Sequence, residues 1–282
     1  MDILVIGGGL TGHLVQRVLP DALILDWNSP AAVPTVPKMW GAQYLWHPIG
    51  GWAHTSCLVH TSIDGHPATP ESILKYKTAI GKGVEVISRP DAVAAQFQPE
   101  MTGYMLDEIP RPTNIQYQCH VVAVDLDRQR VVTRNGGSYA YDVLVSSIPL
   151  PALLRMARPI YPRIPSFRAR AVYVMEHTEP HATVGEGFLH VNYLTSSPVY
   201  RETTRHTGRV HRETLSSDYA MMAAKKLVPG KIWDEPDTPF ILDWLRDHNV
   251  YCFGRYARWD SDELLHQTDA DIRAWSANDL NR

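Results

Sequence analysis

The fold is decided by the stretch ILVIGGGLTG, residues 3–12. The four apolar residues at its start are typical of a short buried strand, and residues 13–19 are expected to continue as a helix. The glycines have the G-x-G-x-x-G spacing: Gly7 permits a tight turn, Gly9 lets backbone N–H groups approach a pyrophosphate, and Gly12 lets the helix pack close to the strand. The stretch therefore predicts a dinucleotide site at the start of a Rossmann-like domain.

A second strand leads to an acidic residue at the spacing that such a site requires. Residues 22–25 are apolar, and Asp26 follows them directly. A carboxylate about 20 positions after the first glycine is expected to bind a ribose hydroxyl. The alternative is a glycine-rich turn between a strand and a helix that holds no ligand.

Length and composition indicate a globular protein with a substantial core. The chain has 282 residues and a formal net charge of −3, which predicts no strong nucleic-acid footprint but does not report on a local basic groove. Cys57, Cys119 and Cys252 lie far apart, so we expect neither a disulfide framework nor a metal site. No apolar run approaches the roughly 20 residues of a membrane span. Since the first residues lead directly into a core strand, we also expect no signal peptide and infer a cytoplasmic protein.

The remaining sequence predicts a discontinuous α/β protein. Its nucleotide-binding domain takes residues 1–45, 112–158 and 240–282, because apolar strands of parallel-sheet type recur at 143–148 and 249–253. Between these parts we expect an inserted helical lobe and a substrate or cap domain built on an antiparallel sheet, at residues 46–111 and 159–239 respectively.

The inserted lobe carries a candidate substrate residue. His47 lies among tryptophans, a tyrosine and the pair Gly50-Gly51, which favours a mobile or ligand-contacting loop. Either His47 contacts the substrate, or it is a satisfied histidine in an aromatic packing cluster. Further along the lobe, Thr69 and Pro70 predict the start of a helix.

Four segments together resemble a known flavoprotein family. They are GGGLTG with Asp26, NGGSYAYDVLVSSIPLPALLRM (Asn135–Met156), PVYRETTR (Pro198–Arg205) and VYCFGRYARWDSDELLHQT (Val250–Thr268). This set is similar to the flavin-dependent amine oxidase superfamily, and within it to the branch of UDP-galactopyranose mutase and protoporphyrinogen oxidase. The resemblance covers most of the chain in order, and it implies FAD as the cofactor rather than NAD.

The resemblance also implies roles for residues near the adenosine half of FAD. Gly7, Gly9 and Gly12 would hold the pyrophosphate, and Asp26 would hold the adenosine ribose. Val121 would meet the adenine through its backbone, as the strand before the NG hairpin does in this family.

The later motifs supply the remaining roles. Gly254 and Arg255 would lie beside the second half of the diphosphate and the ribityl chain. Arg201 matches the arginine of the family's YR strand, which faces the substrate side of the flavin. For both arginines the alternative is a surface or interdomain salt bridge.

Two departures from the family pattern bear on the substrate. The residues WNSP at 27–30 stand where the family has a basic residue and a G-G pair for the flavin phosphates, and Gly50-Gly51 is the candidate replacement. The chain is also far shorter than a typical mutase, and no segment convincingly matches the part that recognises UDP. A trimmed substrate lobe would leave an open flavin face, which suits a bulky or macromolecular substrate.

These inferences lead to one favoured function and two alternatives. The favoured one is an FAD-dependent oxidoreductase of amine-oxidase type, in which a hydride leaves a substrate C–N or C–C bond for flavin N5 while His47 and Arg201 orient a small molecule or modified nucleotide. The second is a non-redox flavin enzyme, either a mutase or a lyase, including a phage-type enzyme that remodels a modified nucleobase. There, arginines that hold an anionic substrate would matter most. The third is a flavin-binding protein without chemistry.

Overall fold

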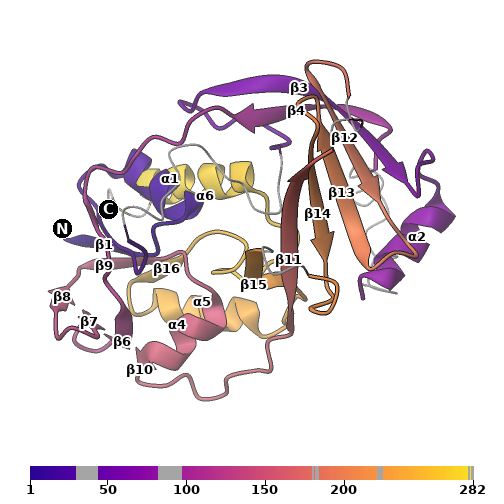
Figure 1. Cartoon of the computed structure of the whole chain (residues 1–282). Coiled ribbons are helices and arrows are strands. Elements are labelled where there is room, and N and C mark those ends of the chain that lie inside the picture. The colour runs from indigo at the N-terminus through magenta and orange to yellow at the C-terminus, as the bar shows by residue number, and fades with distance from the viewer. Residues whose placement is uncertain are drawn as a thin grey trace.

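The structure is a computed structural model that describes residues 1–29, 44–81, 97–179, 181, 184–220, 225–278 and 280. It confirms the expected α/β fold, with a parallel sheet between helices and a separate, largely antiparallel sheet (Figure 1). Within these ranges, no helix is long and apolar enough to cross a membrane.

The parallel sheet is assembled from both ends and the middle of the chain. Its strand order is β16-β9-β1-β2-β5, and every neighbouring pair is parallel. The strands are β1 (Ile3–Ile6), β2 (Leu23–Leu25), β5 (Ile115–Gln116), β9 (Val143–Ser146) and β16 (Val250–Cys252). Because all five run in one direction, their carboxyl ends meet at one edge of the sheet.

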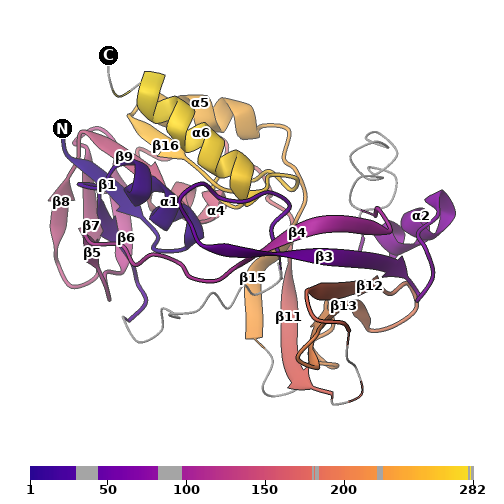
Figure 2. The ribbon, with the colours of Figure 1, turned by 90° about the horizontal axis from the view of Figure 1, so that it is seen from above.

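Helices cover both faces of this sheet (Figures 1 and 2). Successive strand residues alternate between faces, so Val5 of β1 joins the core under α1 and α6, and Leu4 joins the core over α4 and α5. The helices are α1 (Leu10–Val18), α4 (Leu150–Met156), α5 (Thr238–Arg246) and α6 (Leu265–Asn278). The start of α6 at Leu265 is explained by the polar network described below.

A small second sheet lies beside the parallel one. Its order is β10-β6-β7-β8, with a hairpin between β7 and β8 at the predicted Asn135-Gly136 turn. Gly136 has φ +83°, a conformation that glycine adopts without steric cost. The strands are β6 (Val121–Asp125), β7 (Arg130–Thr133), β8 (Ser138–Ala140) and β10 (Ala157–Arg158).

The third sheet has seven strands in the order β15-β11-β14-β13-β12-β3-β4. All neighbouring pairs are antiparallel except β12 and β3. The strands are β3 (His54–Ile63), β4 (Glu100–Leu106), β11 (Ala169–Thr178), β12 (Phe188–Tyr193), β13 (Val199–Arg205), β14 (Arg209–Thr214) and β15 (Lys225–Ile232). One face carries the third apolar core, in which Tyr76 of α2 (Pro70–Ala79) is buried.

The segment 46–111 differs from the expected helical lobe. It supplies β3 and β4, which run side by side from the parallel sheet towards α2 (Figure 2), together with the predicted α2, whose Thr69 and Ser72 form a capping box. The strand at 54–63 was missed because its first three residues are polar and Thr61 occupies one of its buried positions. Residues 30–43 of the expected nucleotide domain and 82–96 of the expected lobe lie outside the described residues.

Candidate cofactor and substrate site

The predicted cofactor residues converge on the carboxyl edge of the parallel sheet. Gly7 follows β1, Asp26 follows β2, Ser147 follows β9, and Gly254 follows β16 after one residue. Ligands of open α/β sheets bind at this edge, where strand ends and helix starts meet. The topology therefore brings together groups that lie about as far apart in sequence as the chain allows.

The glycine turn has the geometry that each glycine was expected to provide. Gly7 has φ +104°, and its carbonyl oxygen accepts a hydrogen bond from Ser147 Oγ at 3.0 Å. A Cβ at Gly12 would lie 2.2 Å from the Gly7 oxygen, so only glycine lets α1 approach the turn. Gly9 is the N-cap of α1, and a Cβ added there would meet nothing within 4 Å. The space in front of the helix start is therefore open to an anion.

Asp26 lies beside the glycine turn with one oxygen atom unsatisfied. Its side chain is buried, and a Cβ at Gly8 would lie 2.5 Å from its Oδ2 atom. Oδ1 accepts hydrogen bonds from the N–H and the side-chain amide of Asn28, at 3.2 and 3.1 Å. Oδ2 is buried without a hydrogen-bond partner. A buried carboxylate oxygen without a donor is unfavourable, and a ribose hydroxyl would supply that donor.

The expected adenine position is flanked by two rings. Val121 begins β6, and His120 immediately precedes it. The ring of Trp27, which follows Asp26, lies 6.1 Å from the His120 ring at 81° and is 69% exposed. In the sequence, Trp27 was visible only as a departure from the family pattern, because its nearness to His120 depends on backbone hydrogen bonds between residues 26–28 and 118–119.

Gly254 joins the far end of the chain to the first helix. Its φ is +91°, and a Cβ there would lie 2.5 Å from Thr11 Oγ1 in the first turn of α1. This close approach brings the last strand of the sheet next to the first turn of α1. The N–H of Gly254 donates to Glu263 Oε1 at 3.2 Å.

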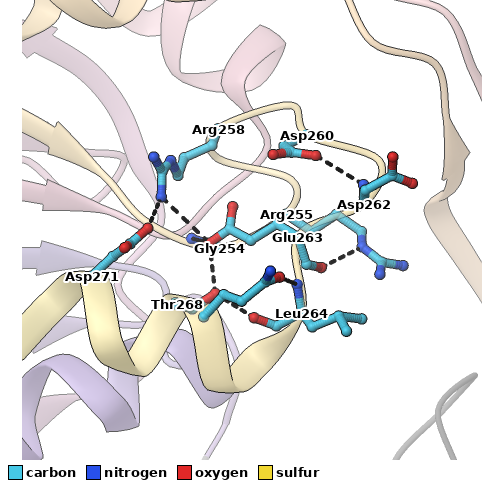
Figure 3. A network of polar contacts seen from close by, with 10 residues as sticks. Gly254, Arg255, Arg258, Asp260, Asp262, Glu263, Leu264, Thr268 and Asp271 are labelled. Atoms are coloured by element: carbon cyan, nitrogen blue, oxygen red, sulfur yellow. Dashed lines mark hydrogen bonds and ion pairs between the residues drawn. The ribbon is translucent and has the colours of Figure 1, made fainter. Parts of the chain in front are cut away.

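Glu263 holds the loop between β16 and α6 together (Figure 3). Oε1 also accepts from Thr268 Oγ1 at 2.6 Å, and Arg258 lies 3.9 Å away while it forms an ion pair with Asp271. Burial raises the pKa of the Glu263 carboxyl, and Thr268 and Arg258 partly oppose this rise. Because residues 255–264 wrap around this carboxylate, the helix begins only at Leu265. Nothing in the local sequence singled out Glu263 from the neighbouring acidic residues.

Arg255 also serves this loop. Its Nε–H donates to the backbone oxygen of Glu263 at 3.0 Å (Figure 3). The structure therefore places Arg255 directly after the Gly254 turn, as predicted, and shows that part of its guanidinium stabilises the loop.

Arg201 is held in a buried ion pair on the seven-stranded sheet. Its Nε–H donates to Glu213 Oε1 at 2.8 Å, and the Tyr200 hydroxyl donates to the same carboxylate. Burial by itself would lower the pKa of Arg201, but the charge of Glu213 outweighs it and the pKa is raised. Arg201 is thus a permanent cation with a counter-ion on the neighbouring strand β14, and its role towards a substrate stays a prediction.

Tyr256 connects this ion pair with the loop after Gly254. Burial raises the pKa of Tyr256, the positive charge of Arg255 lowers it, and the negative charge of Glu213 raises it further. The Tyr256 hydroxyl donates to the backbone oxygen of Gly230 in β15 at 3.3 Å. The loop after Gly254 therefore contacts the seven-stranded sheet, which also carries the Arg201–Glu213 pair.

His47 lies against α6. Its ring centroid is 4.4 Å from that of His266, and burial followed by the nearby charge of His47 lowers the pKa of His266. His266 was not singled out in the sequence, although it lies three residues after Glu263. The two imidazole rings therefore pack edge to face near the start of α6.

Gly50 and Gly51 do not extend the phosphate site. Arg17, in the last turn of α1, donates to the Gly50 carbonyl oxygen, and its guanidinium lies 5.7 Å from the ring centroid of Trp52. At about 1.5 Å of rise per residue, Arg17 lies roughly 10 Å along the helix from its start. The glycine pair is therefore at the opposite end of α1 from Gly9.

A cavity of about 320 Å³ opens between the end of α2 and the seven-stranded sheet. Its polar wall contains the Arg170 guanidinium and the side chains of Ser197, Tyr200 and Ser216. The remaining lining residues are apolar, and none of the described residues that line it is acidic. Over the described ranges, no group of three or more metal-ligating side chains occurs.

Comparison with solved structures finds proteins that share this architecture. No family model matches the chain, and no curated protein matches it in sequence. A reduced UDP-galactopyranose mutase matches with a TM-score of 0.66 at 13% identity, covering 98% of this chain and 93% of that chain. A fatty acid isomerase from P. acnes matches at 0.56 and 12%, covering 97% and 98%. A probable FAD-dependent monooxygenase from Pseudomonas aeruginosa matches at 0.53 and 10%, covering 99% and 87%. At these identities the likeness shows the fold alone, which several classes of flavoenzyme share.

Proposed function

We propose that the protein is an FAD-dependent enzyme. The observation that carries this proposal is the convergence, at one edge of the parallel sheet, of the Gly7 turn, the open space at Gly9, the unsatisfied Asp26 oxygen and the Gly254 turn. These are the groups that a dinucleotide with a diphosphate and a ribose requires. The fold shared with a mutase and a monooxygenase supports FAD over NAD.

In this proposal the chain holds the cofactor mainly through its backbone. Gly7 and Gly9 bind the diphosphate at the start of α1, Asp26 binds the adenosine ribose, and Gly254 borders the other half of the ligand. Bound FAD would supply a hydride acceptor, which no side chain can provide. The protein supplies position and electrostatics.

We propose an oxidoreductase of amine-oxidase type as the first reaction class. The Arg201–Glu213 pair and Tyr256 would line the substrate side, where an uncharged amine needs no strong base. The pair His47 and His266 would orient the substrate or relay a proton between their imidazoles. The support for this class is the resemblance of the four sequence segments, together with the hydrogen bond from Tyr256, in the loop after Gly254, to β15 of the sheet that carries Arg201.

A non-redox mutase or lyase is the second candidate. It is favoured by the cavity, because Arg170 and three hydroxyl-bearing residues line it and none of its described lining residues is acidic. Such a lining suits an anionic substrate that must be held while a covalent step proceeds. The matches to a mutase and an isomerase are compatible with this class.

The visible spectrum of the purified protein tests the cofactor, and anaerobic mixing tests the reaction class. We expect flavin absorbance in the wild type and its loss in Asp26→Asn, with Asp247→Asn as the matched control. Bleaching of the flavin by candidate amines would support the oxidoreductase. Turnover only after dithionite reduction would support the mutase or lyase, and a colourless protein that gains no thermal stability with added FAD would refute the proposal.

A further inference from the structure

Two short segments of the chain are strongly basic although the whole protein is slightly acidic. Residues 163–170 contain three arginines, residues 225–231 contain three lysines, and neither segment contains Asp or Glu. The formal net charge of the whole chain is −3. Positive charge is therefore concentrated in these two segments. Whether the segments lie next to each other depends on the fold.

The fold pairs these segments at one edge of the seven-stranded sheet. β11 and β15 are antiparallel neighbours, with Arg170 directly opposite Lys231 and Val174 opposite Lys225. Like charges at directly opposite positions repel each other. An anion with more than one negative charge that bound between the two cations would reduce this repulsion.

Four of these cations share one face of the sheet, and we call them the basic ribbon: Arg168, Arg170, Lys225 and Lys231. Val174 belongs to the core face, and alternation along β11 places Arg170 on that face too, where it lines the cavity. The ribbon spans about 20 Å along β11, at roughly 3.3 Å per residue. The basic ribbon is therefore longer than the cavity, and it matches a ligand that carries a row of negative charges better than a single anion.

Aromatic rings and hydroxyl groups accompany the basic ribbon. The Arg168 guanidinium lies 5.8 Å from the Trp233 ring centroid, and the Lys231 ammonium lies 4.9 Å from that of Tyr200. In the cavity, Ser197 Oγ accepts from a backbone N–H, which leaves its hydroxyl hydrogen to donate. Cations that track a backbone, together with aromatic faces and a pocket, are the elements with which proteins bind single-stranded nucleic acids.

We propose that the basic ribbon binds the phosphate backbone of a single-stranded nucleic acid, so that one base enters the cavity between α2 and β13. This inference rests on the proposed function only for the chemistry that follows, because the binding depends on the ribbon and not on FAD. The path from ribbon to cofactor site is short: Lys231 is adjacent to Gly230, whose oxygen binds the Tyr256 hydroxyl beside the Gly254 loop. A base in the cavity thus lies on the substrate side defined above.

The test is binding of a fluorescently labelled oligo-dT of twelve nucleotides to the full-length protein, followed by anisotropy over a range of salt concentrations. The variant Arg170→Ala/Lys231→Ala should weaken binding about tenfold or more. It should also lower the slope of log affinity against log salt by roughly 0.7 for each phosphate that the variant no longer binds. Lys226→Ala is the matched control, because Lys226 lies opposite Tyr173 on the other face of the same two strands. It should change affinity less than twofold.

Competitors separate the possible occupants. We expect unlabelled oligo-dT to displace the probe far better than pyrophosphate or heparin at equal phosphate or sulfate concentration. Equal displacement by pyrophosphate or heparin would overturn the proposal in favour of a small-anion or general polyanion site. Unchanged binding in the double variant, or no binding of the oligonucleotide at low salt, would overturn it as well.

A parallel FAD titration keeps this result separate from the cofactor proposal. If the protein takes up no FAD but binds the oligonucleotide through the basic ribbon, the proposed nucleic-acid site is supported and the proposed flavoenzyme function is refuted. FAD binding without ribbon-dependent oligonucleotide binding would do the reverse. The double variant should keep the FAD affinity of the wild type, because its two side chains lie on the other sheet.

Discussion

The proposed cofactor site and the proposed substrate side differ in the groups that form them: backbone turns shape the first, and side chains shape the second. At the edge of the parallel sheet, backbone turns at Gly7, Gly9 and Gly254 shape the proposed cofactor site. On the seven-stranded sheet, side chains such as the Arg201–Glu213 pair and Arg170 shape the proposed substrate side. A site shaped by glycine turns tolerates few substitutions, because any other residue adds a Cβ atom that would clash with neighbouring atoms or occupy the space of the ligand. A side-chain site can change its specificity one residue at a time.

The sharpest way to break this comparison is Gly9→Val. Gly9 has φ −74° and open space around a would-be Cβ, so the free protein should fold normally. The valine side chain would occupy the space of the diphosphate and displace at least two charge-assisted hydrogen bonds. We expect FAD affinity to fall by more than about 100-fold.

Flavin occupancy after purification and thermal unfolding of the FAD-free protein check this expectation. Gly12→Ala is the contrasting variant: its Cβ would lie 2.2 Å from the Gly7 oxygen, so it should reduce stability itself. Full occupancy in a folded Gly9→Val protein would show that the N-terminal site has been misassigned.

Glu213→Gln should have the next largest effect, on stability rather than on the cofactor. It leaves Arg201 without its counter-ion in a buried position, and removal of one partner of a buried pair costs about 3 kcal/mol or more. Urea unfolding at pH 7 measures this loss. Asp243→Asn, in the exposed pair with Arg246, should cost less than about 0.5 kcal/mol. An equal, small change in both variants would contradict the buried ion pair.

Trp27→Ala tests whether a side chain contributes to the proposed cofactor site in addition to the backbone, because it removes a ring that we expect to stack on adenine. Base stacking on an aromatic ring contributes about 1–3 kcal/mol, so FAD affinity should fall roughly tenfold while FMN, which lacks adenine, is unaffected. Isothermal titration with both flavins measures the difference. Phe240→Ala removes an equally exposed ring on α5 and should change neither affinity. Equal losses for FAD and FMN would argue against stacking.

Glu263→Gln should have the smallest effect, visible in the pH dependence of stability. The pKa of Glu263 is raised in the folded state, mainly by burial, from an ordinary value of 4.5. The folded protein therefore holds more protons than the unfolded one just above pH 4.5, and this carboxyl lowers stability as pH rises through that window. Glutamine keeps an acceptor for Gly254 and Thr268 but does not titrate. Unfolding measured from pH 4.5 to 7 should show a flatter profile in the variant, and an unchanged profile would exclude this role.

The cofactor half of the molecule was largely predictable from sequence. The glycine spacing, the apolar strands and Asp26 are local patterns, and each requirement acts on neighbouring residues. Glu263 and His266 were not predictable, because an acidic residue and a histidine in a polar segment have no signature of their own. Their roles come from contacts with Gly254 and His47, and such contacts depend on how distant segments pack.

The substrate side was less predictable for the same reason. Segment 46–111 was expected as a helical lobe, yet β3 and β4 extend the seven-stranded sheet, where strand pairing with β12 outweighs a weak local pattern. The sequence suggested Arg201 as a substrate residue but did not indicate its partner, Glu213, which the pairing of β13 with β14 places against it. A local motif can identify a functional residue type, but it does not predict which charged side chain the fold will place next to that residue.

The sequence alone thus determined that this chain begins a Rossmann-like domain with a dinucleotide turn, because turn geometry and strand burial are encoded by adjacent residues. Only the tertiary structure decided that Gly254 packs on Thr11 and that Arg201 carries a counter-ion. It also decided that two basic segments more than 50 residues apart form one ribbon. The physical reason is that strand order and register are set by the burial of whole faces, a property of the assembled sheet rather than of any one segment.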